Sequence, residues 1–209
     1  TIFEETTFDF DNLLVRMREQ SFLNAGVRIL LRDTREGQER EEVLHYEGGI
    51  VSFVEYLNNE KRGTPIHPDV IYMKGEKNGS IAEVAMQYND SYNETLISFA
   101  NNMSTIEGGT HETGFKSALT RAINDYAKKT GVVKGEERPL SGEDVREGLV
   151  AVISVKLTDA QFESQTKAKL GNSEIRTLVD GIVYNKLTEF FEENPQTGKI
   201  ILEKALSAN

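Results

Sequence analysis

The sequence predicts an α+β fold: a mixed β-sheet with helices packed on one face and a long C-terminal helix. Three observations predict it. Strand-like segments come in runs and do not alternate one for one with helices. The segment 149–157 is almost continuously apolar, which is typical of a buried strand. The segment 173–193 repeats its apolar residues with the 3.6-residue period of a helix that buries one stripe. With 209 residues, 38% of them apolar, the chain can build a substantial core.

The N-terminal segment predicts a helix followed by a hairpin. Asp9 or Asp11 can cap a helix that runs to about Leu23. Two strand-like segments, 27–33 and 43–46, flank a polar turn and are predicted to pair.

The middle of the chain predicts a short helix over 50–57, an irregular crossing over 61–68 and then strands. An Asn78-Gly79 turn is a strong hairpin signal. We expect the three strand segments to form a meander with one buried face: 70–73, 81–88 and 94–100.

The C-terminal half predicts most of the helices. Thr110 is expected to cap a helix that continues to about Tyr126, and a charged connection spans 131–139. Ser141 caps a short turn before the strand at 149–157, and the long helix follows. Pro195 is expected to start a final helix that projects from the domain.

Composition excludes several functions. The 34 acidic and 24 basic residues give a formal charge of −10, which does not favour attraction of nucleic acid over the whole surface. With no cysteine there is no disulfide, thiolate zinc site or thiol nucleophile, which fits a reducing cytoplasm. The sequence has no apolar run near the roughly 18 residues of a membrane helix. It begins at Thr1 without Met, so we expect a segment of a longer cytoplasmic protein.

Catalytic patterns are weak. The histidines, His45, His67 and His111, lack metal-ligand spacing and are interpreted as structural, so no metal ligands are predicted. The segment 108–111, Gly-Gly-Thr-His, has only a superficial likeness to a phosphate loop. Acidic pairs are interpreted as solvated faces.

One loop is a better candidate. Gln165-Thr166-Lys167 lies between the buried strand and the long helix, where a lysine and a helix N-terminus can contact an anion. The alternative is a solvated loop. Lys116 and Arg121 lie away from the apolar stripe of their helix and form either a solvent face or a positive patch for phosphates.

Four runs of sequence together resemble the B subunits of type IIA topoisomerases, which include DNA gyrase B and its topoisomerase IV paralogue, and the likeness to gyrase is the stronger. The resemblance covers essentially the whole chain. The four runs are His45 to Gly49, Glu107 to Phe115, Arg146 to Leu149, and Gln165 to Lys167 with Lys169-Leu170.

The resemblance implies a transducer domain over 1–209, with a ribosomal-protein-S5-domain-2-like fold and a left-handed βαβ crossover. Residues 1–170 would form the core of sheet and helices, and 171–209 the long helical segment. In this family ATP and Mg²⁺ are bound mainly by an upstream GHKL domain, and a TOPRIM domain follows downstream. Neither has a counterpart here, so we expect this chain alone to bind no cofactor and to hydrolyse no ATP.

The resemblance also assigns roles to residues. Lys167 matches a catalytic lysine that reaches the ATP γ-phosphate, and Gln165 matches the glutamine beside it. Lys116 matches a basic residue, usually Arg, in the cavity that receives double-stranded DNA. The implied partners are the chain's own GHKL domain, DNA and a gyrase A-type subunit in an A2B2 assembly, with no membrane. The alternatives are the topoisomerase IV paralogue, a mismatch-repair or chaperone ATPase of the GHKL type, or an RNA-binding module.

Overall fold

A computed structural model describes residues 2–133 and 138–209 of the chain. The chain divides into two compact units, residues 1–53 and 54–209. The division falls inside helix α2 (Ile50–Leu57), so each unit is described by itself. Four residues of the connection predicted over 131–139, namely 134–137, lie outside the described part, as does Thr1.

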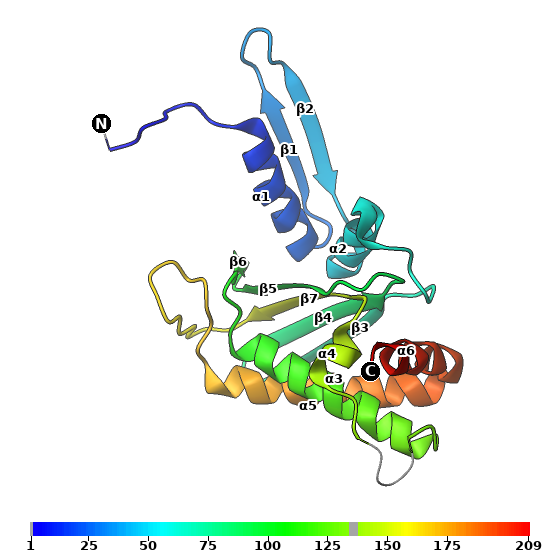
Figure 1. The fold of residues 1–209 in the computed structure, drawn as a ribbon. Coiled ribbons are helices and arrows are strands. Elements are labelled where there is room, and N and C mark those ends of the chain that lie inside the picture. The colour runs from blue at the N-terminus through cyan, green and yellow to red at the C-terminus, as the bar shows by residue number, and fades with distance from the viewer. Residues whose placement is uncertain (1, 134–137) are drawn as a thin grey trace. The chain divides into compact units, whose positions relative to one another are not determined.

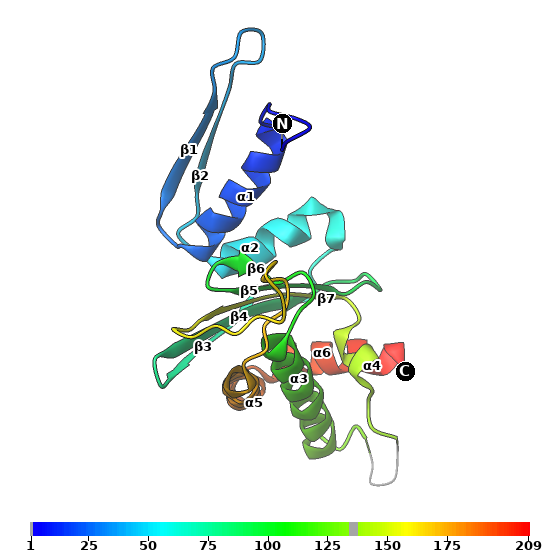
Figure 2. The ribbon, with the colours of Figure 1, turned by 90° about the vertical axis from the view of Figure 1, so that its left-hand side faces the viewer.

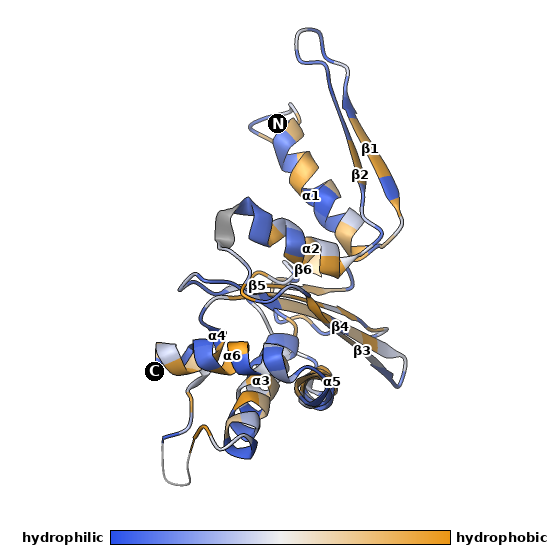
Figure 3. Ribbon diagram, turned by 90° about the vertical axis from the view of Figure 1, so that its right-hand side faces the viewer, coloured by the Kyte–Doolittle hydropathy of each residue, from blue (hydrophilic) through white to orange (hydrophobic). Residues whose placement is uncertain are grey.

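Unit 1 confirms the predicted helix and hairpin. Helix α1 (Phe10–Leu23) begins after Asp9, whose carboxylate accepts a hydrogen bond from the Asn12 amide at 2.9 Å. Strands β1 (Arg28–Asp33) and β2 (Arg40–His45) pair antiparallel. Apolar and polar bands alternate along α1 in Figure 3, as expected for a helix with one buried side. Phe22 at the end of α1 is fully buried and stacks on Tyr46, with ring centroids 3.9 Å apart.

The sheet of unit 2 has the order β3-β4-β7-β5-β6. Strand β7 is antiparallel to β4 and parallel to β5, so the predicted meander is wrong: β7 lies between two strands that were expected to be neighbours. Strand β7 is buried on both faces along almost its whole length, and a strand of this kind is most stable in the centre of a sheet. The five strands are β3 (Ile71–Lys77), β4 (Ser80–Tyr88), β5 (Thr95–Ala100), β6 (Met103–Ser104) and β7 (Leu149–Lys156).

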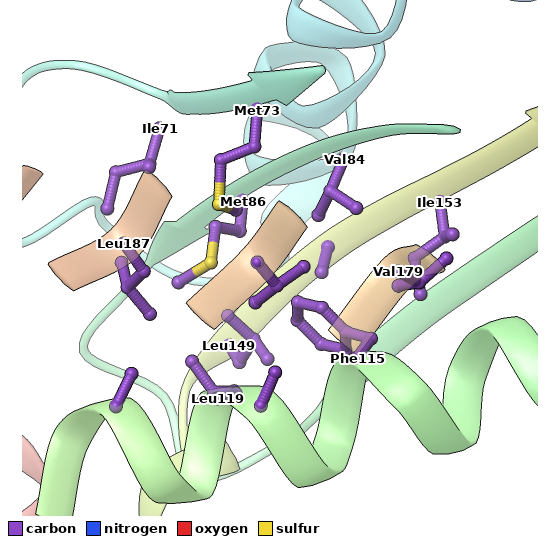
Figure 4. Close-up of a cluster of buried hydrophobic side chains, with 14 of the residues drawn as sticks. Ile71, Met73, Val84, Met86, Phe115, Leu119, Leu149, Ile153, Val179 and Leu187 are labelled. Atoms are coloured by element: carbon purple, nitrogen blue, oxygen red, sulfur yellow. The ribbon is translucent and has the colours of Figure 1, made fainter. Parts of the chain in front are cut away.

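Four helices lie on one face of this sheet, as predicted (Figures 1 and 2). The connection from β5 through α3 to β7 is the parallel crossover. The helices are α3 (Thr110–Lys129), α4 (Gly142–Arg146), α5 (Ser173–Glu193) and α6 (Pro195–Ala208). Figure 4 shows the core between the sheet and α3 and α5, where Phe115 and Leu119 of α3 face Leu149 and Ile153 of β7.

Helices α3 and α5 approach each other closely at Gly114. A Cβ atom there would lie 2.4 Å from the backbone oxygen of Arg176, inside any permitted contact distance. This glycine, in the run from Glu107 to Phe115, therefore serves helix packing.

Three local predictions are corrected. Helix α6 does not project, because Ile201, Leu202 and Ala205 are buried in the core of unit 2. A π-helical turn, η1 (Asn58–Arg62), extends α2 toward a segment predicted to be irregular. Thr110 is not the cap of α3: it is the first helical residue, and Gly109 occupies the cap position. By contrast, Ser141 does cap α4, in a reciprocal pair of hydrogen bonds with Asp144.

No helix in the described part of the chain is both long and apolar enough to cross a membrane.

Candidate functional site

The loop between β7 and α5, drawn in yellow in Figure 1, carries Gln165, Thr166 and Lys167 at its tip, and all three are exposed. The tip is closed by a turn in which the Lys167 amide donates to the Ser164 carbonyl oxygen at 3.1 Å. The hydroxyl oxygens of Ser164 and Thr166 are 2.6 Å apart. The Lys167 ammonium group forms no ion pair or hydrogen bond with any residue that the structure describes. The tip therefore presents one free positive charge to solvent.

Lys167 has a left-handed backbone conformation, with φ of +56°. The other described non-glycine residues with positive φ are Asn78, Asn101 and Asn102, and asparagine tolerates this region well. A lysine held there costs on the order of 1 kcal/mol or more. Backbone geometry alone would favour Gly or Asn at this position.

The two arms of the loop pair with each other below the tip. The Glu163 amide donates to the Lys169 carbonyl oxygen at 3.0 Å, and the two side chains form an ion pair at 3.1 Å. Asn172 is buried at the base, where its Oδ1 accepts from the Gln161 amide at 2.6 Å and its Nδ2 donates to the Asp159 carbonyl oxygen at 2.9 Å. The tip is therefore supported by two hydrogen-bonded arms, and the base of these arms is fixed by the buried Asn172.

The second arm of the loop also pairs with the run at 107–110. The Glu107 amide donates to the Ala168 carbonyl oxygen at 2.9 Å, the Leu170 amide to Gly108 at 3.1 Å, and the Thr110 amide to Leu170 at 3.0 Å. At Gly109 a Cβ atom would lie 2.4 Å from the Leu170 carbonyl oxygen, so only glycine fits. The structure therefore brings together two sequence runs that lie far apart in the chain.

This pairing rules out a phosphate loop at Gly108-Gly109. The Thr110 amide, which would have to face a phosphate, already donates to Leu170. The Glu112 carboxylate lies so close to Gly108 that a Cβ there would be 2.8 Å from its Oε2. A negative charge in this position would repel a phosphate.

His111 is completely buried and belongs to a chain of polar side chains. Its Nε2 is 2.9 Å from Thr105 Oγ1, which is 2.7 Å from Ser98 Oγ, and Ser98 donates to Glu112 Oε1 at 2.6 Å. Burial lowers the pKa of His111 to about 4, so the ring is neutral near pH 7. The prediction of a structural role for His111 is confirmed.

The other two histidines also make packing contacts. Buried His67 accepts a hydrogen bond from the Tyr88 amide on Nε2 at 3.0 Å, while its Nδ1 lies 2.9 Å from the Asp69 carbonyl oxygen. In unit 1, His45 Nδ1 is 3.3 Å from the Val27 carbonyl oxygen. Within the described ranges, no three His, Asp or Glu side chains gather as a potential metal site.

The two basic residues of α3 differ. Arg121 forms an ion pair with Asp180 of α5 at 2.8 Å and lies over the Tyr184 ring. Lys116 is half-buried, and no acidic partner for it is found in the described part of the chain. The two residues therefore do not form one positive patch, and only Lys116 retains an uncompensated charge.

The run from Arg146 to Leu149 joins α4 to β7. Arg146 Nε is 3.1 Å from Glu94 Oε1, and Glu147 pairs with Lys204 of α6 at 3.4 Å. Gly148 has φ of +72°, and a Cβ there would lie 2.4 Å from the Asn89 carbonyl oxygen. This run is thus structural.

Among the described residues, Gln165 and Lys167 do not line the main groove of the domain. This groove has a volume of about 830 Å³ and lies between the β3–β4 turn and the first half of α5. The loop can present a cation to a ligand held by another part of the protein. It does not enclose a ligand by itself.

The mixed sheet with a β5–α3–β7 crossover and a long helix after the lysine loop is a fold that this chain shares with solved domains from the ATPase region of type IIA topoisomerases. The 43K ATPase domain of Thermus thermophilus gyrase B matches with a TM-score of 0.85 and 38% identity, over 99% of this chain and 55% of that one. The gyrase B protein of Myxococcus xanthus matches with a TM-score of 0.82 and 25% identity, over 97% and 62%.

A family model described as DNA gyrase B matches residues 49–209. The DNA gyrase B protein of Clostridium acetobutylicum is 55% identical over the whole chain, and that of Enterococcus faecalis is 54% identical. The chain belongs to the DNA gyrase B family, which confirms the resemblance of the four runs. It spans 32% of the length of each of these two relatives.

Proposed function

We propose that residues 1–209 act as the transducer segment of an ATP-dependent type IIA topoisomerase, and that Lys167 contacts the γ-phosphate of ATP in the full-length protein. One observation carries the proposal: an exposed lysine with no ionic partner among the described residues is held in a left-handed conformation at the tip of a clamped loop. The match of the gyrase B model to 49–209 supports placing this role in unit 2.

The chemistry suits a lysine. A preorganised cation stabilises most where charge develops on the transferring phosphoryl group. Because Lys167 forms no ion pair with the residues that the structure describes, contact with a third phosphate would break no such pair and would add an interaction that ADP cannot provide. Gln165, two residues earlier on the same tip, supplies an amide that can donate to the same group. Loss of the γ-phosphate would release the loop, and the domain would relay that change toward DNA strand passage.

The remaining parts of the reaction would come from elsewhere. The exposed tip offers no cavity for a nucleotide, and the described residues offer no cluster of carboxylates for Mg²⁺. We therefore place the nucleotide pocket, the Mg²⁺ ligands and the group that activates water in the GHKL domain of the full-length protein. This chain alone is then inactive.

The proposal extends to partners and location. A gyrase B of this kind would work in the bacterial cytoplasm with a gyrase A-type subunit, in an A2B2 assembly on double-stranded DNA. Lys116, the α3 lysine without an acidic partner, is the candidate for contact with the DNA duplex.

The test is ATP turnover by the full-length protein with Lys167→Ala. We expect kcat to fall by about 10²- to 10³-fold, the usual loss when one donor to the transition state is removed. Lys169→Ala is the matched control, because Lys169 lies on the same loop but is paired with Glu163. Equal activity of the Lys167→Ala and Lys169→Ala proteins would refute the role of Lys167. Turnover by the 209-residue chain alone would refute the placement of the nucleotide site.

A further inference from the structure

The run at 107–110 has no role in the function proposed above, although the loop of Lys167 rests on it. We propose that Glu107, Gly108, Gly109 and Thr110 are positioning residues for Lys167, because they join its loop to helix α3 so that the two move as one body. This inference rests on the proposed function of Lys167.

The first part of the joint is the pairing of the loop. Residues 168–170 pair through isolated β-bridges and backbone hydrogen bonds with 161–163 on one side and with 107–110 on the other. Ala168 and Leu170 are buried, and they follow Lys167 directly. A displacement of the Lys167 backbone would therefore be transmitted to the paired segment 168–170, which begins at the next residue.

The second part is the attachment of the run to α3. Thr110, which donates to Leu170, is also the first residue of the helix, and the Thr113 amide donates to the Gly109 carbonyl oxygen at 3.1 Å. No flexible residue separates the loop contact from the helix. The N-terminal end of α3 is therefore attached to the loop, and the Thr110 amide is not available to an anion.

The third part is a chain of hydrogen bonds that fixes the start of α3 to β5. The Ser98 hydroxyl donates a hydrogen bond to the Glu112 carboxylate. Its oxygen is then the acceptor for the Thr105 hydroxyl, and Thr105 Oγ1 in turn accepts from His111 Nε2. Ser98 Oγ also lies within hydrogen-bonding distance of the Thr105 carbonyl oxygen, at 3.3 Å. The chain links the strand, the segment before the helix and the first turn of the helix.

Together these contacts connect the tip to a rigid body. Helix α3 carries Lys116 six residues after Thr110, about 9 Å along the axis at 1.5 Å per residue. It also packs tightly on α5 at Gly114. A force on Lys167 from an anion would therefore act directly on α3 and, through it, on α5.

The decisive variant is Gly109→Ala, whose Cβ would meet the Leu170 backbone at 2.4 Å and push the loop away. Gly131→Ala is the matched control. Gly131 follows the other end of α3 and also has a positive φ, of +72°, but apart from its chain neighbours no atom of the described residues lies within 4 Å of its added Cβ.

The first readout is amide hydrogen exchange of Leu170 and Thr110 in the 209-residue chain. We expect at least tenfold faster exchange at both amides in Gly109→Ala and no change in Gly131→Ala. Unchanged exchange rates of the Leu170 and Thr110 amides in Gly109→Ala would refute the proposed attachment of the loop to α3. If Gly109→Ala does not fold, Glu107→Pro provides the same test, because at an exposed position it removes the amide that donates to Ala168.

The second readout is ATP turnover by the full-length protein. We expect Gly109→Ala to lower kcat at least tenfold with little change in KM. The double variant with Lys167→Ala should lose no more than Lys167→Ala alone, because both changes remove the same interaction. Losses that multiply in the double variant would indicate general damage and overturn the positioning role.

The two proposals fail differently. Normal turnover by Lys167→Ala refutes the function of the lysine. A defect in Lys167→Ala with normal turnover in Gly109→Ala refutes the positioning role alone.

Discussion

Acidification should destabilise unit 2 through His111. This ring is completely buried, its Nε2 donates to Thr105, and its Nδ1 has no hydrogen-bond partner among the residues that the structure describes. Protonation would place a charge and an unsatisfied donor in the core. Burial accordingly lowers the pKa of His111 from 6.5 to about 4.

The direction and the size of this change in the free energy of unfolding follow from the difference in proton binding between the folded and unfolded chain. Because the folded-state pKa is the lower one, the unfolded chain binds more protons between pH 6.5 and pH 4. The contribution of His111 is therefore fully present above pH 6.5 and is lost as the pH falls toward 4. The full difference of about 2.5 units corresponds to roughly 3 kcal/mol, of which about 2 kcal/mol is lost between pH 7.5 and pH 5. Burial also lowers the pKa of His67, which adds a loss of the same sign.

The assay is urea unfolding followed by far-UV circular dichroism at pH 7.5, 6.5, 5.5 and 5.0. The wild type should lose about 2 kcal/mol more than His111→Gln over this range. In parallel, the NMR signals of the His111 ring should not titrate above pH 5. An identical pH dependence in the wild type and His111→Gln would refute the reasoning.

Two further predictions concern packing and capping. Gly114→Ala should destabilise unit 2 by about 1–3 kcal/mol, because the new Cβ would overlap the Arg176 carbonyl oxygen. A melting temperature of Gly114→Ala equal to that of the wild type would show that α3 and α5 can move apart without loss of stability. Ser141→Ala should cost about 1 kcal/mol by removing the capping box of α4. Loss of less than half that amount in urea unfolding would show that Asp144 alone holds the turn.

Local signals in the sequence predicted most elements. Asp9 and Ser141 cap the helices that they were expected to cap, and the period of the segment 173–193 matches the observed α5. Each of these signals depends on neighbours within one or two turns. The cap of α3 was missed because Gly109 and Thr110 are adjacent at the start of the helix, and polarity alone favoured Thr110.

Non-local pairing was not predictable in the same way. The position of β7 between β4 and β5 depends on contacts such as Thr95 with Val150, for which no short-range signal exists. The exposed position of Lys167 followed from its place between a strand and a helix, but the joint beneath it did not. The available signal was the double glycine at 108–109, since close approach of two backbones is a common reason for glycine. The nucleotide and DNA roles of Gln165, Lys167 and Lys116 stay predictions.

The central place of β7 has a consequence for how the chain folds. Strands β3 and β4 can form a hairpin early, and so can β5 and β6, but the two halves do not touch until β7 enters between them. During synthesis, the edge of β4 that pairs with β7 therefore stays unpaired while some sixty residues, including all of α3, leave the ribosome. Pairing over such distances slows folding and leaves the open edge prone to aggregation. The loop of Lys167 follows β7 directly, so the candidate site forms only when the sheet closes.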